Sequence, residues 1–101
     1  MYNETFSTVS ASSLIIEGMG KFGGMVLGVD GVNNPTVTVY DNNEASFGNG
    51  MIVPTQEFDA TELRLNGLLF GDKWINFKKG LYVVISCAGV VRVTIYHTKW
   101  V

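Results

Sequence analysis

The last third of the chain contains two runs of β-branched and apolar residues, each about the length of one β-strand. Residues 81–85 read LYVVI and residues 90–96 read VVRVTIY, and only the short segment SCAG separates them. Such runs favour strands over helices, and a short link of small residues is typical of a hairpin. The pattern therefore predicts two neighbouring, paired strands. The first run is apolar on both faces, so we expect it in the middle of a sheet.

The preceding residues repeat the signature of short strands separated by glycine-rich turns. Alternation in residues 36–40 places the two valines toward a core and Thr36 and Thr38 toward water. Pro54 restricts the extended run 51–53 to a sheet edge or an irregular stretch. Because no segment has a helical period, we predict an all-β fold. The expected architecture is a small antiparallel β-sandwich or jelly-roll-like barrel of seven to eight short strands.

The chain has 101 residues, which is room for one domain. Residues 5–13 include six Ser or Thr, so this opening segment has little to bury. We interpret residues 1–13 as an N-terminal arm or a loosely held first strand, and residues 14–101 as a single β-sandwich domain. An arm of this composition is expected to become ordered when it crosses a neighbouring chain or particle.

The shortage of charge predicts association with other chains. Hydrophobic residues make up 47% of the sequence and charged residues 16%, whereas a typical soluble domain has about 25% charged residues. One thin core cannot bury so much apolar surface, and exposed apolar patches usually mark interfaces. We therefore expect a closed homo-oligomer, a homotrimer in the first instance. The net charge of −2 and the scattered basic residues argue against a nucleic-acid partner.

The chemistry of catalysis is missing from the sequence. Cys87 is the single cysteine and His97 the single histidine, so an intramolecular disulfide and a four-ligand zinc site within one chain are excluded. Ten extended residues separate the two, about 33 Å, which excludes a Cys–His dyad. We expect His97 to be an exposed residue at a strand end, with a metal ligand on a trimer axis as the alternative. No enzyme activity and no cofactor are predicted.

Two polar segments leave alternatives open. Residues 41–44 read DNNE and offer oxygen ligands for calcium, but their spacing follows no known calcium loop, so a solvated turn is the favoured interpretation. Residues 61–65 alternate as a half-buried strand would, while Asp59 could instead cap a short helical turn. We also expect neither a secretion signal nor a membrane-spanning segment, which fits folding in a reducing cytoplasm.

The aromatic residues are the candidates for a binding surface. Trp74, Tyr82, Tyr96 and Trp100 could form a sugar-stacking platform if they converge on one face, and core or subunit-interface packing is the simpler alternative. Trp100 is expected to dock against the domain or a neighbour. The candidates for assembly or interface contacts are Tyr2, Phe6, Val9, Trp74, Tyr96 and Trp100.

Three phrases carry a resemblance to a known class of proteins. They are PTVTVYDN at residues 35–42, FKKGLYVV at residues 77–84 and VRVTIY at residues 91–96. Together they resemble small virion structural proteins of tailed bacteriophages, over about residues 20 to 97. The Ser/Thr-rich opening and the last three residues lie outside the likeness.

The resemblance implies a non-enzymatic β-sandwich, often trimeric, that decorates or cements a capsid or belongs to a tail or fibre. We therefore expect a capsid decoration subunit that is made in the cytoplasm of a host bacterium and resides in the virion. Its expected partners are further copies of itself and the major capsid protein or another virion protein. The alternative is a receptor- or carbohydrate-binding module of a tail or fibre.

Overall fold

A computed structural model describes the backbone of residues 2–43, 50–61, 66–71 and 73–100, and the side chains of these segments from Phe6 to Lys99. The described residues form nine strands and no helix. Their bounds are β1 Tyr2–Val9, β2 Ser13–Glu17, β3 Gly20–Val29, β4 Thr36–Asp41, β5 Met51–Glu57, β6 Gly67–Leu69, β7 Ile75–Phe77, β8 Gly80–Ser86 and β9 Val91–Trp100.

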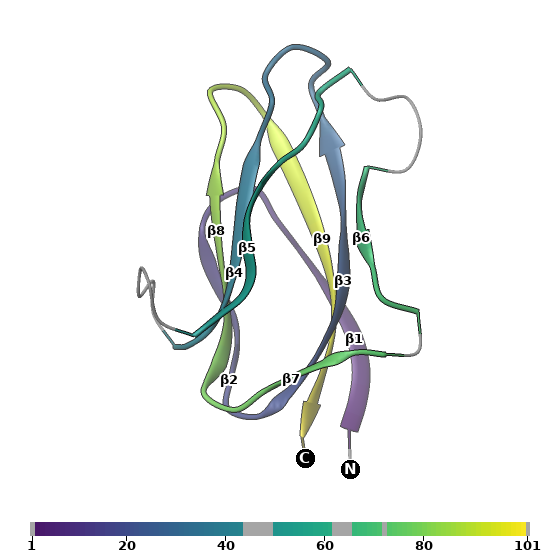
Figure 1. Cartoon of the computed structure of the whole chain (residues 1–101), viewed down its shortest axis with the longest axis vertical. Coiled ribbons are helices and arrows are strands. Elements are labelled where there is room, and N and C mark those ends of the chain that lie inside the picture. The colour runs from purple at the N-terminus through teal and green to yellow at the C-terminus, as the bar shows by residue number, and fades with distance from the viewer. Residues whose placement is uncertain (1, 44–49, 62–65, 72, 101) are drawn as a thin grey trace.

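The strands form two antiparallel sheets that pack face to face (Figure 1). Sheet A has the order β1-β9-β3-β6, and β7 also pairs with β3. Sheet B has the order β2-β8-β4-β5. The predicted all-β sandwich is confirmed, with nine described strands where the sequence predicted seven to eight.

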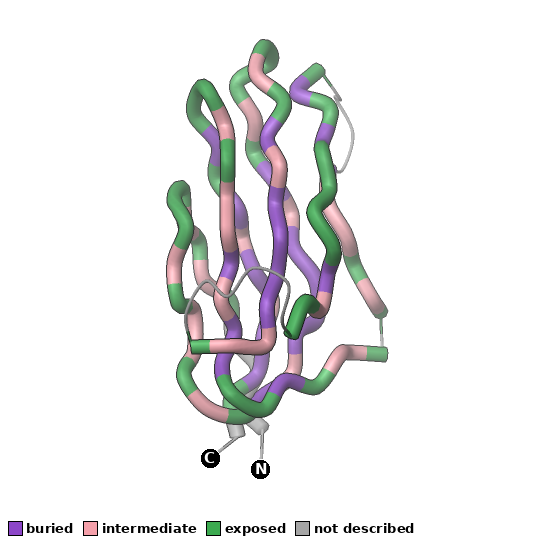
Figure 2. Tube along the Cα trace, turned by 60° about the vertical axis from the view of Figure 1, so that its left-hand side comes forward, coloured by how far each residue is buried: buried purple, intermediate pink, exposed green. Residues whose placement is uncertain are grey.

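The core lies between the two sheets, and its buried residues come mainly from the central strands β3, β4, β8 and β9 (Figure 2). In sheet A, Val91, Val93 and Ile95 of β9 point inward and are buried. In sheet B, Leu81 and Val83 of β8 do the same. Each buried aliphatic side chain of this size stabilises the fold by roughly 1.5–3 kcal/mol, so these residues give the sandwich a hydrophobic core of its own.

The predicted hairpin of the last two strands is wrong, because β8 and β9 lie in different sheets. Strand β8 pairs with β2 and β4, and β9 pairs with β1 and β3. The alternating pattern requires one face of each strand to be buried. Stacking across the core satisfies this requirement as well as pairing side by side does. The central position predicted for the first of the two strands is correct.

The segment expected to be an arm or a loosely held first strand forms β1, the edge strand of sheet A. Its residues pair with β9 from Tyr2 opposite Trp100 to Val9 opposite Val93, without a register shift. Two side-chain hydrogen bonds add to the backbone ladder, between Ser7 Oγ and His97 Nε2 at 2.9 Å and between the hydroxyls of Thr8 and Thr94 at 3.1 Å. The small polar residues that suggested an arm thus anchor the strand.

In sheet B, the predicted edge position of Pro54 is confirmed, and the predicted exposure of Thr38 is wrong. Pro54 lies in β5, which is the edge strand of the sheet, as predicted. Thr38 was expected to face water, but it is buried. Its hydroxyl bonds the hydroxyl of Thr55 across the strand pair at 2.7 Å, so the burial of this polar group is compensated.

The strand predicted for residues 61–65 begins in a turn. The backbone N–H of Thr61 donates a hydrogen bond to the Asp59 carboxylate, and residues 62–65 are outside the described segments.

Candidate functional site

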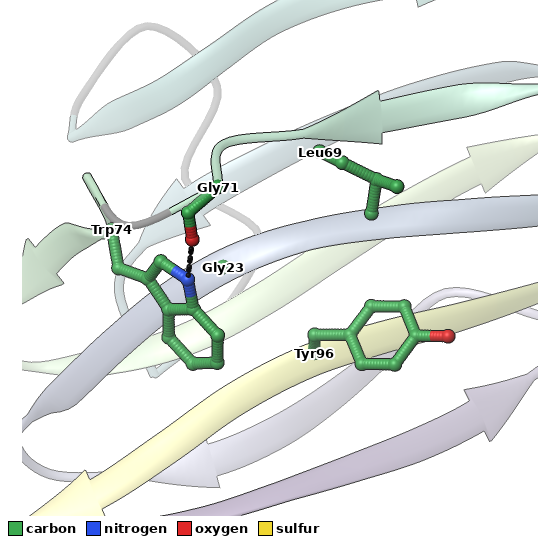
Figure 3. A pocket seen from close by; sticks show the side chains of 5 residues that line it. All are labelled: Gly23, Leu69, Gly71, Trp74 and Tyr96. Carbon is green, nitrogen blue, oxygen red and sulfur yellow. Dashed lines mark hydrogen bonds between the residues drawn. The ribbon is translucent and has the colours of Figure 1, made fainter.

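The indole ring of Trp74 lies flat against the backbone of sheet A. Its Nε1 donates a hydrogen bond to the carbonyl oxygen of Gly71 at 2.7 Å, which holds the ring over Gly23 of β3 (Figure 3). A Cβ atom at Gly23 would overlap the ring atoms of Trp74. The position therefore requires a residue without a side chain. Gly23 also lies where the register between β3 and β9 shifts, between Phe22 and Gly24.

An open apolar pocket of about 260 Å³ lies beside this ring on the outer surface of sheet A. Its lining residues are Gly23, Leu69, Gly71, Trp74 and Tyr96. Figure 3 shows the rings of Trp74 and Tyr96 on the same side of the sheet, with Leu69 across from Tyr96. Because the indole N–H is already bonded to Gly71, the only side-chain polar group of the lining left to a ligand is the Tyr96 hydroxyl.

Phe6 extends this surface toward the edge of the sheet. It lies opposite Tyr96 in the strand register, with the ring centroids 6.5 Å apart and the rings tilted by 51°. Phe6 is 65% exposed and Leu69 is 52% exposed. They lie in one cross-strand row of sheet A, because Phe6 is opposite Tyr96 and both Tyr96 and Leu69 are opposite Gly24. We call Phe6, Leu69, Trp74 and Tyr96 the aromatic face.

The structure thus brings together three of the six interface candidates from the sequence, namely Phe6, Trp74 and Tyr96. Val9 is elsewhere, because its side chain packs against the core. Tyr2 and Trp100 are opposite one another in the backbone register at the end of the β1–β9 pair.

The sugar-stacking platform considered above does not form as a group of four. Tyr82 lies in β8 of sheet B, opposite Tyr40, and so belongs to the other sheet. Trp74 and Tyr96 do converge. The residue that completes their arrangement is Gly23, which leaves room for the indole ring of Trp74.

His97 was expected to be exposed at a strand end, and this expectation is wrong. Strand β9 continues to Trp100, and the His97 side chain is buried on the core-facing side with Ile95. Its Nε2 is bonded to Ser7 Oγ, while its buried Nδ1 has no partner among the described residues. Burial disfavours the charged imidazolium and lowers the pKa of His97 below its usual value.

The oxygen-rich segment considered for calcium has a structural role at Asp41. Its Oδ1 accepts hydrogen bonds from the backbone N–H groups of Lys78 and Lys79 at 2.9 and 2.8 Å. This contact ties the end of β4 to the turn between β7 and β8. Glu44 lies outside the described residues, and within the described segments no three or more His, Cys, Asp or Glu side chains cluster closely enough to hold a metal ion.

We expect EDTA to leave the thermal unfolding midpoint of the protein unchanged. The Asp41 oxygen that calcium would need is already an acceptor for two N–H groups, so removing metal should not lower the free energy of unfolding. Differential scanning calorimetry with and without EDTA measures this directly. A midpoint that falls by several degrees in EDTA and recovers on addition of calcium would contradict the expectation.

Comparisons with known proteins add no relative. No protein-family model matches the sequence, and neither the curated proteins nor the solved structures contain a significant match. Among the described residues there is no helix long and apolar enough to cross a membrane.

Proposed function

We propose that this protein is a non-enzymatic structural protein of a virion, a capsid decoration subunit that attaches to the particle through the aromatic face. The observation that carries the proposal is the exposure of Phe6 and Leu69 beside Trp74 and Tyr96 on a sandwich that has a separate buried core. An exposed apolar cluster that the fold does not need is typical of a surface covered by a partner. The resemblance to small phage virion proteins supports the same assignment, including an oligomeric state.

The chemistry of the pocket favours a protein partner. An apolar lining with one free side-chain hydroxyl suits an aliphatic or aromatic side chain inserted from another polypeptide. A sugar presents several hydroxyl groups, and a tight site needs hydrogen-bonding side chains placed around them. The virion partner is therefore expected to insert an apolar side chain between Trp74 and Tyr96.

A carbohydrate- or receptor-binding role is the second candidate. It is supported by one observation, that Trp74 and Tyr96 present aromatic rings around an open pocket on which a sugar ring could stack. Weak binding dominated by stacking would need few polar contacts. In this case the protein would belong to a tail or fibre.

The attachment surface can be tested with one charged substitution and a matched control. Leu69→Glu places a charge on the aromatic face, whereas Val32→Glu places one at another exposed position, in the loop between β3 and β4. We expect wild type and Val32→Glu to cosediment equally with heads of the source phage that lack this protein. Leu69→Glu should bind at least about tenfold more weakly, because burying an unpaired carboxylate costs more than about 1.4 kcal/mol.

Equal cosedimentation of the two variants would show that attachment uses another surface. A glycan array run in parallel addresses the second candidate. Specific glycan binding that Leu69→Glu abolishes, together with no binding of any variant to heads, would replace the decoration proposal by the carbohydrate-binding one.

A further inference from the structure

The free edges of the two sheets differ in how well they are protected against pairing with another chain. In sheet B, β5 contains Pro54 and two register shifts, and β2 has five residues and one register shift. On the far side of sheet A, β6 and β7 have three residues each. Short strands, prolines and bulges are the devices by which proteins block unwanted edge pairing.

Strand β1 has none of these devices. It is eight residues long, contains neither Pro nor Gly, and follows β9 without a register shift. Glu4 is its one charged residue. Within the described part of the chain β1 pairs only with β9, so its other edge presents backbone N–H and C=O groups that need a partner in water or in another chain.

The described side chains of β1 hold the strand in place and leave one aromatic ring uncovered. Ser7 and Thr8 bond His97 and Thr94 of β9, so the edge is ordered before any partner arrives. Phe6 packs beside Tyr96 and is 65% exposed. A large aromatic ring beside an open strand edge is suited to cross-strand packing against a further strand.

We propose that β1 pairs antiparallel with β1 of a second copy of this chain, around a two-fold axis at Phe6. Phe6 then lies opposite Phe6 of the second copy, and residues 3–9 of the two chains overlap. The two rings lie side by side on the outer face of the joined sheet and extend the Phe6–Tyr96 contact across the joint. Backbone groups of both edges are satisfied at the same time, since an antiparallel pair of identical strands is self-complementary.

The sequence of β1 favours this register over the neighbouring ones. With the axis at Phe6, Glu4 lies opposite Thr8 of the second copy, so no like charges are opposed. An axis at Thr5 would place Glu4 opposite Phe6. An axis at Ser7 would shorten the overlap to residues 5–9 and place Phe6 opposite Thr8.

The pairing goes beyond the proposed function, and one consequence rests on that function. A two-fold axis between antiparallel strands stands perpendicular to the sheet, so both copies present the outer side of sheet A in the same direction. The two pockets between Trp74 and Tyr96 would then face one particle surface together. Two linked weak contacts bind far more tightly than either does alone.

Cysteine cross-linking tests the register. In a Cys87→Ser background, Phe6→Cys is compared with Thr8→Cys, which lies on the same side of the strand and is also exposed. At the proposed axis the two copies of residue 6 are directly opposite, within the Cα spacing of a disulfide. The two copies of residue 8 are four residues apart, about 13 Å. We expect a disulfide-linked dimer from Phe6→Cys under mild oxidation and little from Thr8→Cys. Equal yields, or no dimer from Phe6→Cys, would overturn the proposed register.

The mass in solution tests the pairing without a disulfide. Light scattering coupled to gel filtration should give a dimer for wild type and a monomer for Phe6→Lys, because two ammonium groups would meet at the axis. Circular dichroism confirms that Phe6→Lys is folded. A wild-type monomer at high micromolar concentration would overturn the pairing. A trimer would also overturn it, because a two-fold contact between two β1 strands closes as a dimer and cannot build a three-fold ring. Either result leaves the head-binding comparison of Leu69→Glu and Val32→Glu to decide the proposed function separately.

Discussion

Replacing Gly23 by alanine is expected to expel the indole ring of Trp74 and to destroy the pocket on the aromatic face. The new methyl group would overlap ring atoms that the Gly71 hydrogen bond holds in place. Overpacking of this kind costs about 1–3 kcal/mol of stability, and the ring can relieve it only by leaving its position. We therefore expect both a lower free energy of unfolding and a loss of binding to heads that is at least as large as for Leu69→Glu.

Gly28→Ala is the matched control, because it lies on the same strand and its added Cβ atom would meet nothing closer than 4.0 Å. It should bind heads like wild type and unfold at the same denaturant concentration or slightly above it, since alanine restricts the unfolded chain more than glycine does. Chemical denaturation and the fluorescence of Trp74 in a Trp100→Phe background measure the two effects. An unchanged emission spectrum and unchanged stability of Gly23→Ala would contradict the close contact described here.

Acidification from pH 7.5 to pH 5 is expected to destabilise the protein through His97. The buried, neutral imidazole has a lowered pKa in the folded state, whereas in the unfolded chain it titrates near 6.5. Below that pH the unfolded state binds more protons than the folded state, so the free energy of unfolding falls as pH decreases. The stabilisation is fully present above pH 6.5 and is lost as pH falls toward the folded-state pKa.

The effect can be assigned to one residue, because His97 is the only histidine in the chain. The Asp30 carboxylate accepts N–H groups of Asn33 and Val32, which lowers its pKa to about 2, and hydrogen bonds from Thr61 lower the pKa of Asp59. Their contributions are lost only at lower pH. Denaturant titrations at several pH values should give a slope between pH 5 and 7 for wild type that His97→Gln lacks.

Direct NMR titration of the imidazole in the wild-type protein keeps this expectation testable even if His97→Gln is poorly folded. The chemical shifts of its carbon-bound ring protons should report a pKa below the usual range for histidine. Titration at or above pH 6.5 would show that the side chain is solvated in the folded protein, and would remove the physical basis of the predicted slope.

The sequence predicted the strands well because strand formation is a local property. Alternating residues in 36–40 and the apolar run 81–85 identify strands without reference to the rest of the chain. The alternation did not predict the burial of Thr38, which depends on the packing of the whole sheet. Pro54 identifies an edge for the same reason, since it lacks a backbone N–H. The pairing of strands is different. Val83 and Val93 are buried whether β8 and β9 pair or stack, so their pattern cannot distinguish the two arrangements.

The candidate site was predictable only in part. An aromatic residue can be predicted as a contact residue from its type alone, and Phe6, Trp74 and Tyr96 are interface candidates for this reason. Their convergence depends on the β1–β9–β3 pairing, which joins segments from both ends of the chain. Gly23 had a usable signal, because two successive glycines inside a strand often mark a bulge or a close approach. No sequence signal indicated the burial of His97, since its hydrogen-bond partner Ser7 is 90 residues away in the chain.

The pairing of the first strand with the last determines when sheet A can form during synthesis of the chain. Of the nine described strands β1 is translated first, yet its only partner among them is β9, which is translated after the other eight. Among the described strands, β4 and β5 are the only two that follow one another in the sequence and also pair within a sheet. Few strand pairs can therefore form early from local contacts. Folding must therefore wait for contacts between distant segments, which is slow. Throughout that interval both edges of β1 are unpaired, so β1 of a second copy can pair with either of them.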